Sequence, residues 1–135
     1  MKPKRTYNSG RWTEARWRSF VVSALRAAFR RWPPKSDVLK NAKRGTMMSR
    51  KVNREVNAYI CALCNNLFTY TSMQVDHKKP VVHPKKGFAG FTEFVNRLFC
   101  EAKDLQAVCK PCHKRKTDKE RKQRVQYKRI ARSKE

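Results

Sequence analysis

The chain has 135 residues, a length typical of one domain, and only 39% of them are hydrophobic, which argues against a large core. Thirty-four Lys and Arg against ten Asp and Glu give a formal charge of +24, far beyond the magnitude of about 2 to 8 that suits solubility alone. The charge indicates a polyanionic partner. Nucleic acid is favoured over a membrane because no lipidation motif is present and the aromatic residues do not gather with basic ones in one amphipathic segment.

The N-terminal stretch Met1–Arg5 is basic, but no apolar run of signal-peptide length follows it. Nothing approaches the ~18 apolar residues of a membrane span. We therefore expect a soluble, cytoplasmic protein that does not bind membranes. Reducing conditions favour zinc thiolates over disulfides.

The first predicted element is a helix that Thr13 caps and that reaches about Arg31. Pro33 and Pro34 end it, and Ser36 is expected to cap a shorter helix to about Lys43. We expect the apolar stripe of the first helix to be core rather than a partner-binding face. The stripe consists of Trp17, Phe20, Val21, Ala24, Leu25, Ala28 and Phe29.

The stretch 40–54 is basic and contains Gly45, which suggests a connecting segment that either touches phosphates or is simply solvated. Further on, residues 73–76 read as a short strand that ends at Asp76 and His77. Thr92 is positioned to cap a helix that carries Phe94, Val95, Leu98 and Phe99. Residues 105–108 read as a second strand, and Pro111 as the first residue of a basic helix running toward Ala131.

Four of the five cysteines form two CxxC knuckles, Cys61 with Cys64 and Cys109 with Cys112, which fit a tetrahedral four-thiolate zinc site. A plain zinc ribbon separates its knuckles by roughly 15 to 20 residues. Here 44 residues intervene, so we expect the zinc to clamp the base of a large insertion. Such a staple suits a chain with a small core. The fifth cysteine, Cys100, is interpreted as a small buried hydrophobe.

All three histidines lie near these knuckles. Asp76 and His77 form an adjacent pair, and His113 directly follows a knuckle cysteine. Taken alone, the pair could be a strand end with a satisfied histidine. His77 can accept a proton from water at pH 7, and Asp76 offers a hard oxygen ligand for Mg²⁺ or Mn²⁺. His83 precedes a proline in a predicted loop and is interpreted as a surface residue or at most a phosphate contact.

The segments CALC, VDH, DLQAVCKPCH and KRKT, in this order between Tyr59 and Thr117, resemble the HNH endonucleases. The preceding WTEARWRSFVVSALRAAFRRWPPK is similar to the helical leader of small HNH proteins encoded by bacteriophages. The resemblance implies an α+β fold, a ββα-metal finger stapled by a four-cysteine zinc site. The expected divisions are an N-terminal helical extension (1–57), the nuclease core (58–118) and a basic C-terminal helix (119–135).

The resemblance further implies a metal-dependent DNA endonuclease that hydrolyses phosphodiester bonds. It implies that His77 is the general base and that Asp76 and His113 are ligands of a catalytic Mg²⁺ or Mn²⁺. The protein would hold a structural zinc ion in addition. Most family members carry Asn where this chain has Asp104, and that Asn is thought to secure the loop holding the catalytic histidine. Aspartate can accept the same backbone hydrogen bonds but cannot donate any. Asn96 is an alternative anchor, although a surface role suits its predicted helix better.

Two other functions remain open from the sequence. A zinc-stabilised DNA-binding accessory with an idle active site is compatible with Asp104, and an RNA-associated structural protein is compatible with the basic tails. The basic run after Cys112 is either a solvated face or a DNA contact, and we favour DNA. Phage-type HNH proteins can work beside the DNA-packaging terminase, which suggests that machine as a partner through residues 12–32. The target site and oligomeric state do not follow from the sequence.

Overall fold

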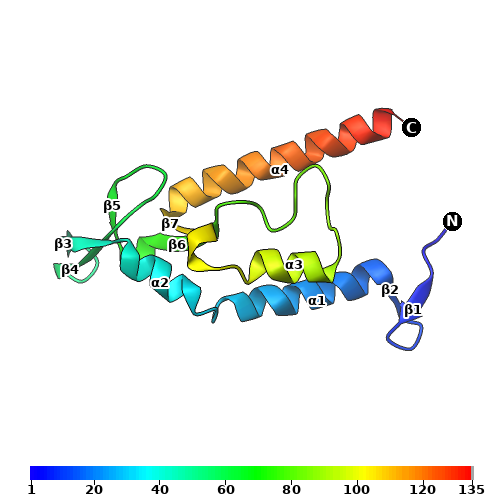
Figure 1. Cartoon of the computed structure of the whole chain (residues 1–135), viewed down its shortest axis with the longest axis horizontal. Coiled ribbons are helices and arrows are strands. Elements are labelled where there is room, and N and C mark those ends of the chain that lie inside the picture. The colour runs from blue at the N-terminus through cyan, green and yellow to red at the C-terminus, as the bar shows by residue number, and fades with distance from the viewer. Residues whose placement is uncertain (135) are drawn as a thin grey trace. The chain divides into compact units, whose positions relative to one another are not determined.

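The computed structural model describes residues 1–134, which form a mixed α+β architecture of four helices and three small antiparallel sheets (Figure 1). The chain divides into two compact units, one comprising Met1–Trp32 and the other beginning at Pro33. No helix among the described residues combines the length and the apolar character needed to cross a membrane. The α+β class expected from the sequence is confirmed.

The first unit pairs strand β1 (Arg5–Tyr7) with β2 (Trp12–Thr13) and continues into helix α1 (Glu14–Phe29). Thr13 caps α1 as predicted, since its side-chain oxygen accepts a hydrogen bond from the backbone N–H of Arg16 at 3.2 Å. The Tyr7 ring stacks on Trp17 with 4.4 Å between ring centroids. The short β-ribbon is thus fastened to the helix that follows it.

The apolar stripe of α1 does not form the expected core. No residue of α1 is buried, and Phe20 keeps 60% of its surface exposed. The remaining apolar side chains of the helix are mostly half-buried. The physical reason is size, because one helix and a two-stranded ribbon present too little surface to enclose a core of their own.

The second unit starts with helix α2 (Pro34–Asn41), whose N-cap is Pro33. The prediction that Ser36 caps this helix is wrong, because the fixed φ of Pro34 suits the first helical position and the helix begins there. α2 packs against strand β7 (Leu105–Cys109) and contributes Val38 to the core.

The stretch that we expected to be a connecting segment is instead a β-hairpin, so that prediction is wrong. Strand β3 (Lys43–Ser49) pairs with β4 (Arg54–Ile60), and β5 (Leu67–Thr69) adds a third strand beside β4. Met47 and Val56 face each other as a half-buried apolar pair, which favours pairing despite the surrounding basic residues. Gly45, at φ +62°, lies where the register of β3 shifts.

The element that carries the Asp-His pair is strand β6 (Met73–His77), which pairs antiparallel with β7 (Leu105–Cys109). Both strands were predicted, each one residue shorter. Between them the chain forms α3 (Phe91–Leu98) and the short 3₁₀ turn η2 (Ala102–Asp104); another such turn, η1 (Tyr70–Ser72), precedes β6.

Helix α3 begins one residue before the predicted cap. Thr92 does not cap it, because Gly90, at φ +101°, occupies the N-cap position. Phe94 and Leu98 of α3 are buried and join residues of β6 and β7 in a small core. The other buried apolar residues are Val38, Ala42, Ala58, Cys61, Met73, Val81, Leu105, Ala107, Val108, Cys109 and Cys112.

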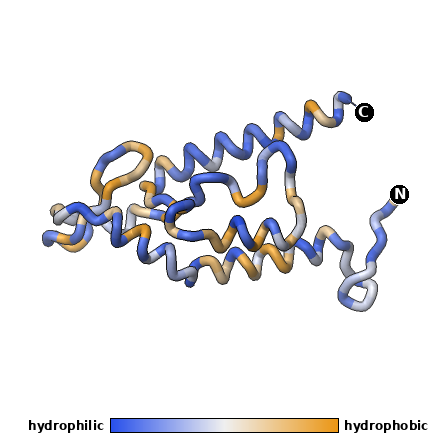
Figure 2. The backbone as a smooth tube through the Cα atoms, viewed as in Figure 1, coloured by the Kyte–Doolittle hydropathy of each residue, from blue (hydrophilic) through white to orange (hydrophobic). Residues whose placement is uncertain are grey.

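Helix α4 (Lys110–Ser133) leaves this core directly after β7 and has Pro111 in its first turn, as predicted. It is hydrophilic along most of its length (Figure 2). Only Cys112 of its 24 residues is buried, and every residue from Arg124 to Lys134 is exposed. The distal half of α4 is therefore a surface element.

Candidate functional site

The four knuckle cysteines converge on one point of the second unit. Their sulfur atoms all lie within 4.8 Å of one another, and Cys64 Sγ is 3.9 Å from Cys109 Sγ. Four sulfurs bound tetrahedrally to one zinc ion at ~2.3 Å would lie about 3.8 Å apart. All four thiols are free of disulfide bonds. The cluster therefore has the composition and spacing to hold a zinc ion.

The first knuckle follows β4 and closes as a tight turn. Asn65 adopts the left-handed region at φ 60° and donates its backbone N–H to the Cys61 carbonyl at 2.9 Å. The backbone N–H of Leu63 points at Cys61 Sγ at 3.4 Å. The Ala62 N–H donates to the Ala107 carbonyl at 2.9 Å and thereby fastens this knuckle to β7.

The second knuckle joins the end of β7 to the start of α4. Cys109 is the N-cap residue of α4 and Cys112 lies in its first turn, where the helix dipole favours negative charge. The Arg115 guanidinium donates to Cys112 Sγ at 3.1 Å, and this contact raises the pKa of Arg115. Both features stabilise thiolates, the form that binds zinc.

The thiols of the cluster differ in acidity. Burial would raise the pKa of Cys61, but hydrogen bonds from the backbone N–H groups of Cys64, Cys109 and Leu63 outweigh it and lower the pKa to about 6. Burial raises the pKa of Cys109 to about 12, and hydrogen bonds with neighbouring thiols act in the same direction. Of these two thiols, Cys61 loses its proton to an incoming metal ion more readily.

Cys100 stands apart from the cluster and is half-buried, more accessible than expected. Burial raises the pKa of its thiol, and the negative charge of Asp104 adds to the shift. A protonated thiol is a poor metal ligand. The interpretation of Cys100 as a non-ligand agrees with both observations.

A second cluster lies beside the zinc-type site and contains the predicted catalytic residues. Asp76 and His77 end β6, and His113 lies in the first turn of α4. His113 Nε2 is 3.9 Å from Asp76 Oδ1. The structure therefore brings together two residues that are 37 positions apart in the sequence.

His77 is held by the backbone of the insertion. Its Nε2 lies 2.8 Å from the carbonyl oxygen of Leu98. Because a carbonyl can only accept, Nε2 must carry the proton in this bond. In the neutral ring the lone pair is then on Nδ1, which is the atom able to take up a proton.

Lys116 belongs to the basic run after Cys112 that we expected to be a solvated face or a DNA contact, but it lies at the centre of this cluster. Its Nζ donates to the His77 carbonyl at 2.9 Å and to Glu120 Oε1 at 2.7 Å. It also lies 2.9 Å from Asp76 Oδ2. The helical spacing of His113, Lys116 and Glu120, which places them on one face of a helix, is the sequence signal that could have predicted this position of Lys116.

The carboxylate of Asp76 is 14% exposed and only partly satisfied. Lys116 Nζ approaches Oδ2 to 2.9 Å, but the angles at this contact make it an ion pair rather than a hydrogen bond. Among the described residues no donor completes a well-aligned bond to that buried oxygen. The charge of Oδ2 is therefore balanced by Lys116, while its hydrogen-bonding capacity is not fully used.

The predicted anchor Asp104 lies beside His77 but acts there through its backbone. Its carbonyl accepts a hydrogen bond from the Lys78 N–H at 2.9 Å, directly after the strand end. Its carboxylate is exposed and lines a cleft of about 290 Å³ together with His77 and Asn96. Asn96 itself is exposed on α3, in agreement with the expected surface position.

His83 belongs to a separate turn. Its Nδ1 accepts the backbone N–H groups of Lys85 and Lys86 at 3.1 and 3.2 Å, and it forms an isolated β-bridge with Gly87. The ring is half-buried and stabilises the turn.

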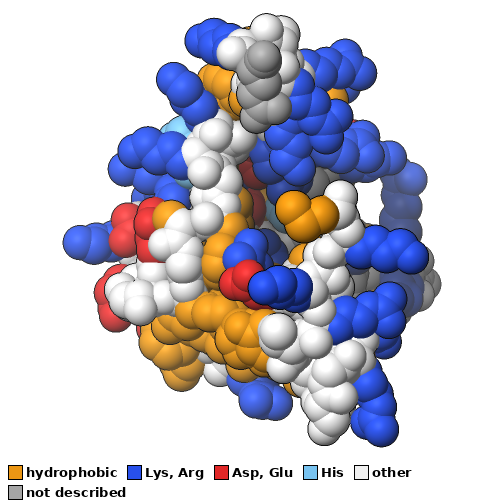
Figure 3. Space-filling view, turned by 90° about the vertical axis from the view of Figure 1, so that its right-hand side faces the viewer, with side chains coloured by type: hydrophobic (Ala, Val, Ile, Leu, Met, Phe, Trp, Pro, Cys, Tyr) orange, Lys and Arg blue, Asp and Glu red, His pale blue; other side chains and the backbone are white. Residues whose placement is uncertain are grey.

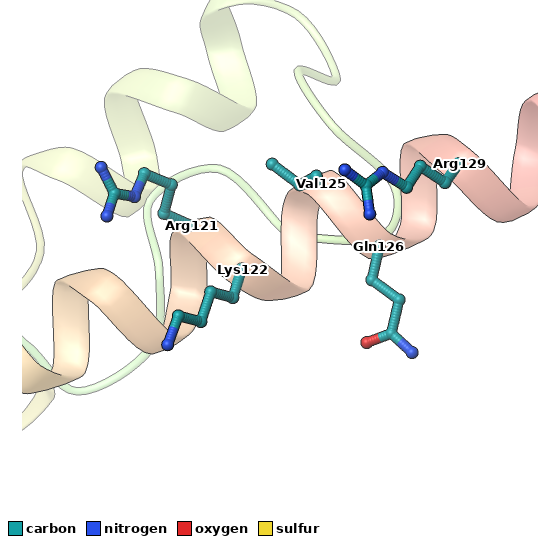
Figure 4. Close-up of a pocket in the computed structure, with 5 residues that line it drawn as sticks. All are labelled: Arg121, Lys122, Val125, Gln126 and Arg129. Atoms are coloured by element: carbon teal, nitrogen blue, oxygen red, sulfur yellow. The ribbon is translucent and has the colours of Figure 1, made fainter.

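Basic side chains continue along α4 beyond the cluster. The helix carries eleven Lys and Arg against two acidic residues. Arg121, Val125 and Arg129 point to one side of the helix, and Lys122 and Gln126 to the other (Figure 4). Lys and Arg cover much of the face that is turned to the viewer in Figure 3. The outer half of α4 is thus a ridge of positive charge.

Comparison with protein-family models, with curated proteins and with solved structures finds no match to this chain.

Proposed function

We propose that the protein is a metal-dependent DNA endonuclease of the HNH type, in which β6, β7 and α4 form a ββα-metal finger. The observation that carries this proposal is the meeting of Asp76 Oδ1 and His113 Nε2, 3.9 Å apart, beside a histidine oriented by the Leu98 carbonyl. The four-cysteine cluster supports it, because it fixes the strand and the helix that bear these residues.

The spacing of Asp76 and His113 suits one divalent cation. Two ligands ~2.1 Å from the same ion lie roughly 3.0 Å apart as octahedral neighbours and roughly 4.2 Å apart when opposite. The observed 3.9 Å lies between these two separations, so a shift of the two side chains by less than about 1 Å in total would bring them to neighbouring positions around one ion. Bound Mg²⁺ or Mn²⁺ would supply charge neutralisation at the scissile phosphate.

His77 acts as the general base in this proposal. Its proton on Nε2 is engaged by Leu98, so Nδ1 accepts the proton of the attacking water. Lys116 holds the strand end through the His77 carbonyl and partly neutralises Asp76. The basic ridge of α4 binds the phosphate backbone and brings DNA to the cluster.

A second candidate is a DNA-binding accessory that does not cut. The position of Lys116 favours it, because an ammonium group 2.9 Å from Asp76 Oδ2 already supplies one positive charge to the carboxylate that would bind the metal. Both candidates place the protein in the cytoplasm of a phage-infected cell, with DNA as partner and the packaging terminase as a further one.

Plasmid nicking separates the two candidates. We expect that His77→Ala lowers the metal-dependent nicking of supercoiled DNA by 10²-fold or more, the typical contribution of a general base. His83→Ala is the matched control, since that ring stabilises a remote turn, and it should keep near-parental activity. Zinc content and DNA affinity are measured in all three proteins. If no protein nicks DNA with Mg²⁺ or Mn²⁺ while all bind it, the accessory is correct.

A further inference from the structure

The β3–β4 hairpin is a concentrated positive surface remote in sequence from α4. Between Lys43 and Arg54 the chain has five Lys and Arg and no acidic residue. All five side chains are exposed: Lys43, Arg44, Arg50, Lys51 and Arg54. Such a surface is suited to contact with a polyanion.

The outer part of this hairpin is a free-standing two-stranded ribbon. β5 pairs only with Ala58–Ile60, so the pairs from Thr46–Asn57 to Ser49–Arg54 extend beyond the third strand. At the tip, the Val52 N–H donates to the Ser49 hydroxyl at 3.5 Å, and Asn53 takes the left-handed conformation at φ 52°. Val52 and Met48 keep 50% and 59% of their surface exposed.

The base of the hairpin is fixed to the zinc-type cluster. The Ile60 N–H donates to the Ala42 carbonyl at 2.9 Å, and Cys61 follows immediately. The ribbon is therefore held at a defined position by the same cysteines that fix β7 and the start of α4. A rigid base lets exposed side chains act together on one partner.

We propose that the β3–β4 hairpin is a second DNA contact that enters the major groove of the duplex, an inference that rests on the proposed function of the chain. The major groove of B-DNA is ~12 Å wide and admits a two-stranded ribbon. Lys and Arg of the tip contact phosphates and guanine edges, and the exposed Met48 and Val52 contact thymine methyl groups. A-form RNA has a deep, narrow major groove that excludes such a ribbon.

The test is the salt dependence of duplex binding, measured by fluorescence anisotropy without divalent metal so that no cleavage occurs. The variant Arg50→Gln, Lys51→Gln, Arg54→Gln is compared with the control Lys2→Gln, Lys4→Gln, Arg5→Gln, which removes the same charge at exposed positions. We expect the log–log salt slope to fall by about 2 to 3 in the hairpin variant and by less than about 1 in the control. Zinc content verifies folding.

A footprint locates the groove. Guanine N7 atoms protected from dimethyl sulfate by the parent should become reactive with the hairpin variant. Equal slopes for the hairpin variant and the control, or an equal loss of affinity for duplex RNA, would overturn the inference and leave the nuclease proposal in place. If the parent protein never cleaves DNA but the salt slopes and the footprint are as expected, the nuclease proposal is wrong and the hairpin contact is retained.

Discussion

At the scale of single residues, the two carboxylate oxygens of Asp76 have different neighbours. One carboxylate oxygen lies toward His113 and the other toward Lys116. The Lys116 ammonium sits among Asp76, Glu120 and the His77 carbonyl. Although burial opposes its charge, Glu120 and Asp76 raise its pKa. Lys116 therefore stays charged at neutral pH and compensates a carboxylate that is largely withdrawn from water.

Replacing Lys116 tests how much a nearby positive charge stabilises the Asp76 carboxylate. Lys116→Met removes the positive charge and leaves the buried carboxylate unpaired, which we expect to lower the free energy of unfolding by roughly 2 kcal/mol without divalent metal. Added Mn²⁺ should restore part of this loss, because it supplies a cation to the same carboxylate. Urea unfolding of zinc-loaded protein, with and without Mn²⁺, measures both effects.

The matched control is Lys119→Met, which removes one charge from an exposed position of the same helix and should change stability by less than about 0.5 kcal/mol. A Lys116→Met protein as stable as the parent would show that the ion pair contributes nothing. A loss that Mn²⁺ leaves untouched would argue against metal binding at Asp76.

At the scale of elements, the four cysteines connect parts of the second unit that have few other ties. Cys61 and Cys64 follow β4, Cys109 ends β7, and Cys112 lies in α4. The core around them is small, so bound zinc is expected to contribute about 10 kcal/mol or more to folding, as in other small zinc-dependent folds. We therefore expect the ordering of the candidate site to depend on bound zinc.

A single ligand change tests this dependence. We expect Cys112→Ser to lose zinc and cooperative unfolding of the second unit, because three thiolates and a hydroxyl bind zinc far more weakly than four thiolates. Cys100→Ser is the control and should keep one zinc per chain, since Cys100 lies outside the cluster. Zinc analysis and thermal unfolding are the measurements, and full zinc retention by Cys112→Ser would contradict the assignment.

The elements also show which patterns the sequence reveals. The paired CxxC spacing, the strand ending at His77 and the proline at the start of α4 were all readable, because each depends on local chemistry. The β3–β4 hairpin was missed because its apolar pair, Met47 and Val56, is hidden among basic residues. The caps assigned to Ser36 and Thr92 failed because Pro34 and Gly90 set the helix starts through backbone conformation instead.

The candidate site was predictable only in part for a similar reason. Asp76, His77 and His113 stand out by residue type and by their closeness to the knuckles. Lys116 looked like one of many surface lysines, and its position beside Asp76 depends on how α4 packs on β6. The roles of these residues in catalysis remain predictions.

At the scale of the whole molecule, the excess of positive charge is distributed over several elements. Within the second unit it concentrates on the β3–β4 hairpin and on α4. Between the last residue of the hairpin, Ile60, and the first residue of α4, Lys110, lie 49 residues. α4 is about 36 Å long, roughly one turn of duplex DNA. Both elements adjoin the cysteine cluster, so a duplex bound by them would be brought close to Asp76, His77 and His113.

The most direct test of the nuclease proposal is the chemistry of the nicked ends. Zinc-loaded protein is incubated with supercoiled plasmid and Mg²⁺ or Mn²⁺, and the nicked product is treated with DNA ligase. Attack by a water that His77 activates, with departure of the 3′ oxygen, leaves 5′-phosphate and 3′-hydroxyl ends. We predict metal-dependent nicks that ligase seals. Nicks that ligase cannot seal, or no nicks from protein that holds zinc and binds the plasmid, would contradict the account.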